Sequence, residues 1–378
     1  MTTPRSVTLG GARVVTPHGV IEDGVVRIDG GVITEVGPRS GASPDASAID
    51  LGGAWLLPGF IDLHMHGGGG FDAAESPDSM RESLAFHRAH GTTGSLVSLV
   101  AAPADRLVEQ LEWVAALTRD GAALGAHLEG PFLARSRCGA QNPMHLLDPD
   151  PQLFAKLSDA ASGTLRMVTL APELPGAVDL VREVVEGDAV AALGHSNATY
   201  DEAVRGIDAG ASVATHLFNG VPPLHHREPG LVGAALAHGL ACELINDGIH
   251  VHPAIARLVD HLVLVTDSIA AAGTGDGMYA LGDQQIAVVD GVARLPNTGS
   301  LAGSTLTMAA AVRRTVRDSG LSIERASAAA SARPAAVLGI DHRVGRIAVG
   351  LTADLVVLDA ELYVAGVLMN GEWSTPLS

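Results

Sequence analysis

The stretch GFIDLHMH (residues 59–66) begins a series of short apolar runs that decides the fold. The segment after it, SPDSMRESLAFHRAHG (residues 76–91), is typical of a helix, because Ser76 can cap it, Pro77 suits its first position and Gly91 can end it. Seven more strand-like runs follow, mostly separated by helical segments: TGSLVSLV (93–100), GAHLE (125–129), LRMVTLAPE (165–173), VAALGH (190–195), ASVATHL (211–217), ACELIND (241–247) and VLVTDS (263–268). Eight strands that alternate with helices predict an α/β protein with a TIM-like (β/α)8 barrel.

An open, doubly wound sheet is the alternative to the barrel. Such a sheet binding a dinucleotide would need a GxGxxG turn after its first strand, and the cluster GGGG at residues 67–70 lacks that spacing. Local helix signals agree with the alternating pattern, since Thr199 and Glu202 have the spacing of a capping box.

Both ends of the chain have a different character from the middle. Short strand-like runs with tight glycine turns fill SVTLGGARVVTPHG (6–19) and GVVRIDGGVITEVG (24–37), and the same style returns after a helical stretch that ends near Leu338. We therefore expect a small β-sandwich domain built from residues 1–57 and 342–378, with the catalytic barrel, residues 58–341, inserted between them.

Composition restricts the function. The 378 residues carry a formal charge of −18, which argues against nucleic-acid and membrane-surface partners, because an acidic field repels polyanions. No apolar stretch has membrane-spanning length and the N-terminus does not resemble a signal peptide, so we expect a cytoplasmic protein. Cys138 and Cys242 are too few for a disulfide framework and are expected to be reduced thiols.

Side chains that favour metal ions stand at the ends of several apolar runs. They are His64, His66, Glu129, His195 and His216. His64 and His66 are two residues apart in a strand and share one face, and closure of a barrel brings all the strand ends around one axis. A lone histidine more often packs or lies on the surface, but five such residues at equivalent places predict a site for zinc, iron or a similar divalent ion.

Asp267 ends the eighth run. A carboxylate there can coordinate a metal ion, take a proton from water and return it to a leaving amine. The alternative is that Asp267 caps the next helix, although VTDSIAAAGTG (265–275) starts no obvious helix.

Several longer phrases carry a family resemblance. They are PGFIDLHMHG (58–67), HLEGPF (127–132), GHSNATYDEA (194–203), THLFNGVPPLHHREPGL (215–231), DGIHVHP (247–253), VTDSIAAAG (265–273), GSLAGSTLTM (299–308) and GRIAVGLTADLVVLD (345–359). Together they resemble the N-acetylglucosamine-6-phosphate deacetylases of the amidohydrolase superfamily, from about residue 24 to residue 371. HxH alone marks only the superfamily, whereas GHSNAT, THLFN and REPGL in this order are specific.

The resemblance implies a metal-dependent deacetylation. Many two-metal amidohydrolases bridge their ions with a carbamylated lysine on the fourth strand, but the only lysine here, Lys156, precedes that strand in a helical context. The resemblance implies that Glu129 takes this place. One or two divalent ions per subunit, zinc being the first choice, would activate water, and Asp267 would serve as base and then acid to give acetate and glucosamine 6-phosphate.

The resemblance also implies a clamp for a sugar phosphate. In it Asn219 and the backbone of Gly220 approach the phosphate, Arg227 pairs with it, and His250 contacts the sugar. A surface ion pair with Glu228 is the alternative for Arg227. The resemblance also implies a homodimer, in which Arg227 or His250 can reach the site of the neighbouring subunit.

Two further residues are candidate substrate contacts. Gln141 stands where one common version of the pattern has a histidine, and its amide can donate a hydrogen bond but cannot relay a proton. Met308 can pack on the acetyl methyl group, although core filling is the commoner fate of a methionine.

Three functions compete at this point. The first is deacetylation of N-acetyl-D-glucosamine 6-phosphate in amino-sugar catabolism or recycling. The second is a sibling amidohydrolase acting on N-acetylgalactosamine 6-phosphate, a purine or a cyclic amide. The third is a non-catalytic scaffold, which the complete set of candidate ligands argues against.

Overall fold

A computed structural model describes residues 6–39 and 48–377. Residues 1–5, 40–47 and 378, which belong to the expected small β domain, lie outside the described residues. The chain divides into two compact units. One comprises the described residues up to Ile61 together with His87–Gly94 and those from Met308 onward, and the other comprises Asp62–Phe86 and Ser95–Thr307. The domain bounds expected from the sequence, 1–57 with 342–378 and 58–341, remain a proposal.

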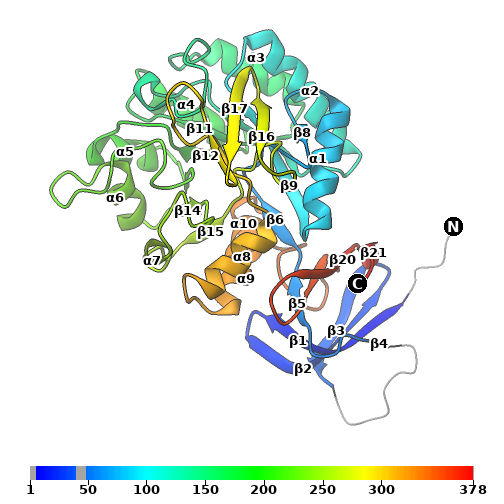
Figure 1. Ribbon diagram of the computed structural model, residues 1–378. Coiled ribbons are helices and arrows are strands. Elements are labelled where there is room, and N and C mark those ends of the chain that lie inside the picture. Colours follow the sequence, from blue (N-terminus) through cyan, green and yellow to red (C-terminus); the bar gives the residue numbers. More distant parts are fainter. Residues whose placement is uncertain (1–5, 40–47, 378) are drawn as a thin grey trace. The chain divides into compact units, whose positions relative to one another are not determined.

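A parallel sheet of eight strands, most of whose residues belong to the larger unit, forms the centre of the barrel (Figure 1). Its strands are neighbours in the order of the sequence and coincide with the eight predicted runs, so the predicted barrel is confirmed. They are β6 (Phe60–Asp62), β9 (Thr92–Val100), β10 (Gly125–Glu129), β11 (Leu165–Leu170), β12 (Val190–Leu193), β13 (Val213–Ala214), β14 (Ala241–Leu244) and β15 (Leu262–Leu264).

Burial explains why these runs form strands of a barrel. All five residues of β10 are buried, as expected for a parallel strand whose two faces are both covered. Hydrogen bonds just beyond the strands close the sheet, because the amide of Asp267 donates to the carbonyl of His64 and the amide of His66 donates to the carbonyl of Ser268, both at 2.8 Å. The ends of the first and eighth strands are therefore held together.

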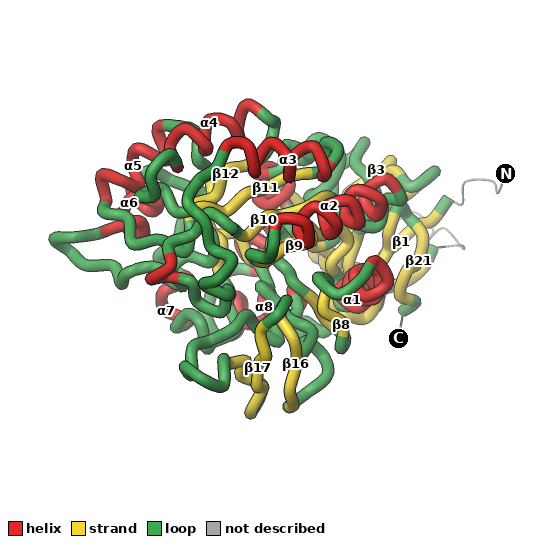
Figure 2. The backbone as a smooth tube through the Cα atoms, turned by 90° about the horizontal axis from the view of Figure 1, so that it is seen from above, coloured by secondary structure: helices red, strands yellow, loops and turns green. Residues whose placement is uncertain are grey.

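Helices follow the strands along the chain, and Figure 2 shows α2 to α5 outside the strands β9 to β12. The helices are α1 (Pro77–Ala89), α2 (Ala104–Arg119), α3 (Pro151–Ala161), α4 (Ala177–Glu186), α5 (Tyr200–Asp208), α6 (Gly230–Ala237), α7 (Pro253–Ala256), α8 (Met308–Arg317), α9 (Ile323–Ala330) and α10 (Ala332–Val337), with a 3-10 turn at Arg135–Arg137. In α2, Leu107, Leu111 and Val114 are buried at intervals of three and four residues, which makes one apolar face.

The helix signals in the sequence are confirmed locally. The Thr199 side chain accepts a hydrogen bond from the amide of Glu202, and the Glu202 side chain accepts one from the amide of Thr199, so α5 begins with a full capping box. Ser76 accepts from the amide of Ser79 at the start of α1, and Gly91 lies beyond its end with φ +93°.

Two small sheets complete the larger unit. A three-stranded antiparallel sheet of β16 (Gly277–Leu281), β17 (Gln284–Val289) and β18 (Val292–Arg294) follows the last barrel strand (yellow in Figure 1). The pair β7 (Gly67–Gly68) and β8 (Phe71–Asp72) follows the first. The sequence analysis predicted neither sheet.

The smaller unit contains one eight-stranded sheet from both ends of the chain. Its strands are β1 (Val7–Thr16), β2 (Gly19–Asp29), β3 (Val32–Pro38), β4 (Ile49–Asp50), β5 (Trp55–Pro58), β19 (Leu355–Leu358), β20 (Val364–Met369) and β21 (Glu372–Thr375). Ile33 of β3 and Leu368 of β20 belong to one buried cluster, although their strands lie near opposite ends of the sheet. The sheet therefore curls around a shared core, which agrees with the predicted β layer from both termini.

Among residues 6–39 and 48–377, none of the helices combines the length and the apolar character that crossing a lipid bilayer requires.

Candidate metal centre

Six predicted metal ligands lie at or just beyond the carboxyl ends of the barrel strands. Glu129 is the last residue of β10, and the others follow the ends of β6, β12, β13 and β15. All six side chains belong to buried residues, with an exposed fraction of at most 8%. The set is His64, His66, Glu129, His195, His216 and Asp267.

Just beyond the ends of three of these strands, the backbone adopts an unusual conformation. His195, His216 and Asp267 have φ values of +46°, +29° and +47°, in the left-handed region that side chains disfavour. Hydrogen bonds hold these turns, because the carbonyl of His195 accepts from the amide of Ala134, and that of Asp267 accepts from the amide of Ser304. Such strain persists where the surrounding structure enforces it and is common at functional sites.

The six side chains form two groups. In one, Nε2 of His64 and Nε2 of His66 lie 3.1 Å apart, and Oδ1 of Asp267 is 3.5 Å from the first and 3.2 Å from the second. In the other, Oε1 of Glu129 lies 3.0 Å from Nε2 of His195 and 3.1 Å from Nε2 of His216. Each group brings its donor atoms within 4.8 Å of one another.

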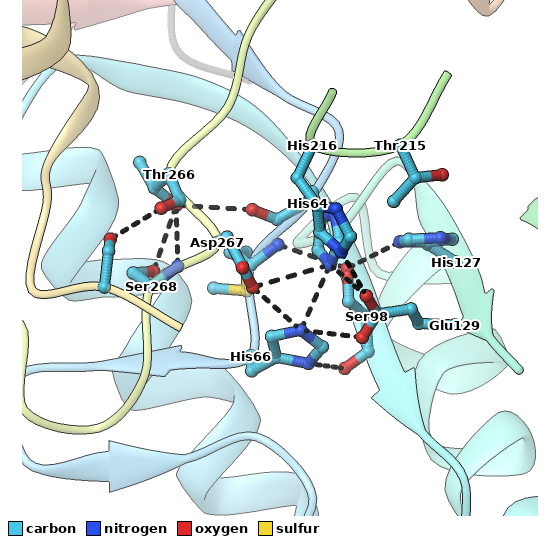
Figure 3. A network of polar contacts seen from close by, with 12 residues as sticks. His64, His66, Ser98, His127, Glu129, Thr215, His216, Thr266, Asp267 and Ser268 are labelled. Atoms are coloured by element: carbon cyan, nitrogen blue, oxygen red, sulfur yellow. Dashed lines mark hydrogen bonds and ion pairs between the residues drawn. The ribbon is translucent and has the colours of Figure 1, made fainter. Parts of the chain in front are cut away.

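Glu129 lies between the two groups. Its Oε1 is 3.4 Å from Nε2 of His64, and its Oε2 is 3.4 Å from Nε2 of His66. Figure 3 shows His64, His66, Glu129 and Asp267 pointing toward one another from different parts of the barrel. The carboxylate of Glu129 is therefore placed to serve both groups.

The hydrogen bonds of the outer ring nitrogens test whether this arrangement fits a metal ion. Nδ1 of His66 lies 3.1 Å from the carbonyl oxygen of Ser98, and Nδ1 of His195 lies 2.7 Å from that of Arg137. A carbonyl oxygen only accepts, so each Nδ1 carries a proton, and in the neutral ring the lone pair of Nε2 faces the centre of its group. Converging imidazole and carboxylate lone pairs fit a divalent cation.

The pKa shifts of the clustered side chains also indicate a site for a divalent cation. Burial lowers the pKa of the His66 imidazole, but hydrogen bonds to Asp267 and Glu129 outweigh it and raise that pKa to about 9. Burial likewise raises the pKa of Glu129, yet the surrounding histidines hold it well below its usual value. The two carboxylates therefore stabilise positive charge at the centre, which a divalent cation supplies.

Asp267 is ionised in this environment. Burial raises the pKa of its carboxyl group, but His64 and His66 more than offset this and leave the pKa below its ordinary value. An ionised carboxylate beside candidate metal ligands can accept a proton from water.

A buried polar network lies behind Asp267. The hydroxyl of Thr266 donates to Oδ2 of Asp62 at 2.6 Å, and the hydroxyl of Ser268 donates to the carbonyl of Gly67 at 2.8 Å. Burial raises the pKa of Asp62 to about 7, against the opposing hydrogen bond from Thr266. These bonds connect the ends of the first and eighth strands on either side of Asp267.

The metal-ligand groups border a cavity of about 400 Å³. Four of the predicted substrate contacts also line it, namely Gln141, Asn219, Gly220 and His250. Arg227 instead lines a different cavity, and its Nη1 lies 2.8 Å from Nε2 of His226. Met308 is fully buried at the start of α8. The roles of these residues toward a substrate remain predictions.

Gln141 uses both ends of its amide within the protein. Its Nε2 donates to Oε2 of Glu129 at 2.7 Å, and its Oε1 accepts from the amide of Ala101, also at 2.7 Å. The side chain therefore orients Glu129. Where the sequence suggested a substrate contact, the structure shows a hydrogen bond that supports Glu129, a predicted metal ligand.

The sequence analysis missed two residues of the site. Arg137 is the only arginine or lysine among the described residues that line the cavity. Glu243, fully buried in β14, lies 3.3 Å through Oε2 from Nδ1 of His64. The sequence signal for Glu243 was a lone acidic residue inside the apolar run ACELI, whereas Arg137 ends a short 3-10 turn that no sequence pattern predicted.

Both cysteines are free, as expected. Burial, reinforced by the nearby Glu243 carboxylate, raises the pKa of the Cys242 thiol to about 12.

The chain is similar to known proteins over most of its length. A model of the amidohydrolase family matches residues 55–374. The chain is 37% identical to N-acetylglucosamine-6-phosphate deacetylase of Bacillus subtilis (strain 168), over 95% of this chain and 94% of that protein. It is 36% identical to N-acetylgalactosamine-6-phosphate deacetylase of Escherichia coli O157:H7, over 95% of this chain and 97% of that protein.

A solved structure is similar over nearly the whole chain. It is the crystal structure of N-acetyl-D-glucosamine-6-phosphate deacetylase from Mycobacterium smegmatis, which superposes with a TM-score of 0.92 at 40% identity. The match covers 97% of this chain and 100% of that one.

Proposed function

The chain belongs to the amidohydrolase family, and we propose that it hydrolyses the acetamide of N-acetyl-D-glucosamine 6-phosphate to D-glucosamine 6-phosphate and acetate. The observation that carries this proposal is the convergence of six buried ligand side chains, in two groups joined by Glu129, at the edge of one cavity. Relatives that are 36–37% identical over almost the full length are deacetylases of sugar phosphates.

The ligand groups and the family support a divalent metal cofactor. We propose zinc, held by Glu129, His195 and His216, with a second ion held by His64, His66 and Asp267. When bound, such an ion supplies Lewis-acid polarisation to the amide carbonyl and to the attacking water.

The protein's own residues perform the proton transfers. Asp267 is ionised, so it can take the proton of the attacking water and then deliver it to the nitrogen of the departing amine. Glu129 is held in place by the hydrogen bond from Gln141, and the rings of His66 and His195 are fixed by backbone carbonyls. This rigidity keeps the reacting groups oriented, which accelerates the reaction without a covalent intermediate.

The phosphate requires positive charge elsewhere in the cavity. Arg137, Asn219, Gly220 and His250 line it, and arginine holds phosphate by paired, charge-assisted hydrogen bonds. We propose that Arg227, which lies outside this cavity, completes the clamp in the neighbouring subunit of a homodimer. A cytoplasmic location is part of the same proposal.

A second candidate substrate is N-acetylgalactosamine 6-phosphate, because a relative of nearly equal identity carries that name. The two sugars differ only in configuration at C4. Measuring acetate release from a panel of N-acetylated sugars, with and without the 6-phosphate, tests both candidates.

We expect the metal-loaded protein to deacetylate N-acetyl-D-glucosamine 6-phosphate with the highest kcat/KM of the panel. Higher efficiency on the galactosamine isomer would select the second candidate. Acetate release from none of these sugars would contradict both.

A further inference from the structure

Glu243 is a buried acidic residue for which the proposed reaction assigns no role. It lies in the wall of the barrel, in β14, and its exposed fraction is 0%. Its neighbours in the strand, Cys242 and Leu244, are also buried. An ionised carboxylate in such surroundings is unfavourable unless positive charge or hydrogen-bond donors compensate it.

The contacts of Glu243 lead to both metal-ligand groups. Oε2 lies 3.3 Å from Nδ1 of His64, which belongs to the group with His66 and Asp267. The same oxygen accepts a hydrogen bond of 3.3 Å from the backbone amide of His216, which belongs to the group with Glu129 and His195. One carboxylate oxygen thus contacts one ligand residue of each group.

The contact of Glu243 with His64 determines which nitrogen of the His64 ring can bind a metal ion. A carboxylate oxygen accepts a hydrogen bond from Nδ1–H, so the neutral ring presents the lone pair of Nε2 to His66 and Asp267. The side-chain contact makes His64 directly dependent on Glu243, whereas His216 is contacted only through its backbone.

The second oxygen of Glu243 has no partner. Among the described residues, neither Oε1 of Glu243 nor Nδ1 of His216 forms a hydrogen bond, although both atoms are buried. Contacts within the described residues therefore satisfy only one of the two oxygens of this side chain, and the other is buried without a partner.

We propose that Glu243 is a positioning residue that holds His64 in its metal-binding orientation and whose negative charge stabilises an ion bound by His64, His66 and Asp267. The proposal rests on the metal-dependent function above. Metal binding by the group of His64, His66 and Asp267 should depend on Glu243 more than metal binding by the other group. The reason is that Glu243 contacts the ring of His64 but only the backbone of His216.

The test measures metal binding without substrate. Purified wild-type protein and Glu243→Gln, Glu243→Ala and Glu243→Asp variants are stripped of metal and titrated with zinc against a chromophoric chelator. Elemental analysis gives the ions per chain, and anomalous diffraction at the zinc edge identifies the group that holds each ion. Glu173→Gln is a matched control, since Glu173 also accepts two hydrogen bonds near the site but contacts none of the six ligand side chains.

We expect Glu243→Gln and Glu243→Ala to weaken the ion at His64, His66 and Asp267 about 10- to 100-fold, with a smaller change at Glu129, His195 and His216. Glu243→Asp should recover part of the affinity, and Glu173→Gln should bind like wild type. With the metal at a saturating concentration, kcat should recover while KM changes little.

Four results would overturn the proposal. They are wild-type affinity at both groups in Glu243→Gln, equal weakening of both groups, no rescue by Glu243→Asp, and binding of a single ion by the wild-type protein at the Glu129 group. Glu243→Gln preserves side-chain volume, so it decides the matter if Glu243→Ala does not fold. The metal titration contains no substrate, so failure of the deacetylase function would leave its result unaffected.

Discussion

Asp267 joins two roles in one side chain, because it lies within 3.5 Å of both histidines of its group and is also the candidate proton acceptor. The sequence alone predicted its place at the end of the eighth strand. It did not predict the left-handed φ of +47°, because that turn depends on hydrogen bonds to His64 and Ser304, which are distant in the sequence.

Replacing Asp267 by Asn separates these roles. We expect kcat to fall about 10²- to 10⁴-fold, the usual contribution of general acid–base catalysis, because an amide cannot take up a proton. Elemental analysis should still find bound metal in Asp267→Asn, and anomalous diffraction should place an ion at the Glu129 group. Turnover near the wild-type rate in Asp267→Asn would remove Asp267 from the proton transfer.

Arg137 and Arg227 give a second prediction at this scale. We expect Arg137→Ala to raise KM for the phosphorylated sugar about 10- to 100-fold, as loss of a charged hydrogen bond does, and to change KM for free N-acetylglucosamine little. Arg227→Ala should act in the same direction if a second subunit supplies it. Equal effects on both sugars would contradict a phosphate role.

The two cysteines differ in reactivity for a physical reason. A thiol with a pKa of about 12, as burial gives Cys242, is a thiolate in only about one molecule in 10⁴ at pH 8. Cys138 is partly exposed. We expect a thiol reagent to modify Cys138 quickly and Cys242 only after unfolding, and mass spectrometry of the labelled peptides checks this. Fast labelling of Cys242 in the native protein would be inconsistent with its burial.

At the scale of helices and strands, the sequence predicted a feature correctly where both residues of the interaction are close together in the chain. The capping box of α5 is an example, because Thr199 and Glu202 are three residues apart. The sheet β16–β18 shows the limit. Its Asp290-Gly291 turn, with both φ values positive, is a hairpin signal, but β18 beside it has only three residues and the hairpin was not predicted.

The cap has a measurable effect on stability. Thr199→Ala should lower the free energy of unfolding by about 1 kcal/mol, because the amide of Glu202 loses its acceptor. Denaturant unfolding of Thr199→Ala, Glu202→Ala and the double variant measures the coupling between the two residues. Strictly additive effects would show that the reciprocal bonds contribute nothing.

For the whole molecule, the alternation of strands and helices was sufficient to predict the barrel, and strand ends were sufficient to predict that the six candidate ligands lie close together. Periodicity does not report which groups support the ligands. Glu243 and Gln141 act through contacts whose partners lie far away in the sequence, so only the folded chain reveals them.

Removal of the metal should destabilise the whole barrel. Binding at 100 times the dissociation constant stabilises a protein by about 2.7 kcal/mol, so we expect chelation to lower Tm by roughly 5 °C. Zinc should restore Tm, whereas magnesium, which prefers oxygen ligands, should not. Calorimetry before and after chelation checks this, and an unchanged Tm would argue against a bound ion in the purified protein.

The bonds that close the barrel also bear on how the protein is made. Thr266 and Asp62 lie 204 residues apart in the chain, yet they are hydrogen-bonded beside the metal ligands. During synthesis His64 and His66 leave the ribosome long before Asp267 exists, so no nascent fragment that ends before residue 267 can present all six candidate ligands. We therefore expect the complete metal complement to be acquired only after the eighth strand of the barrel has been made and has paired with the first.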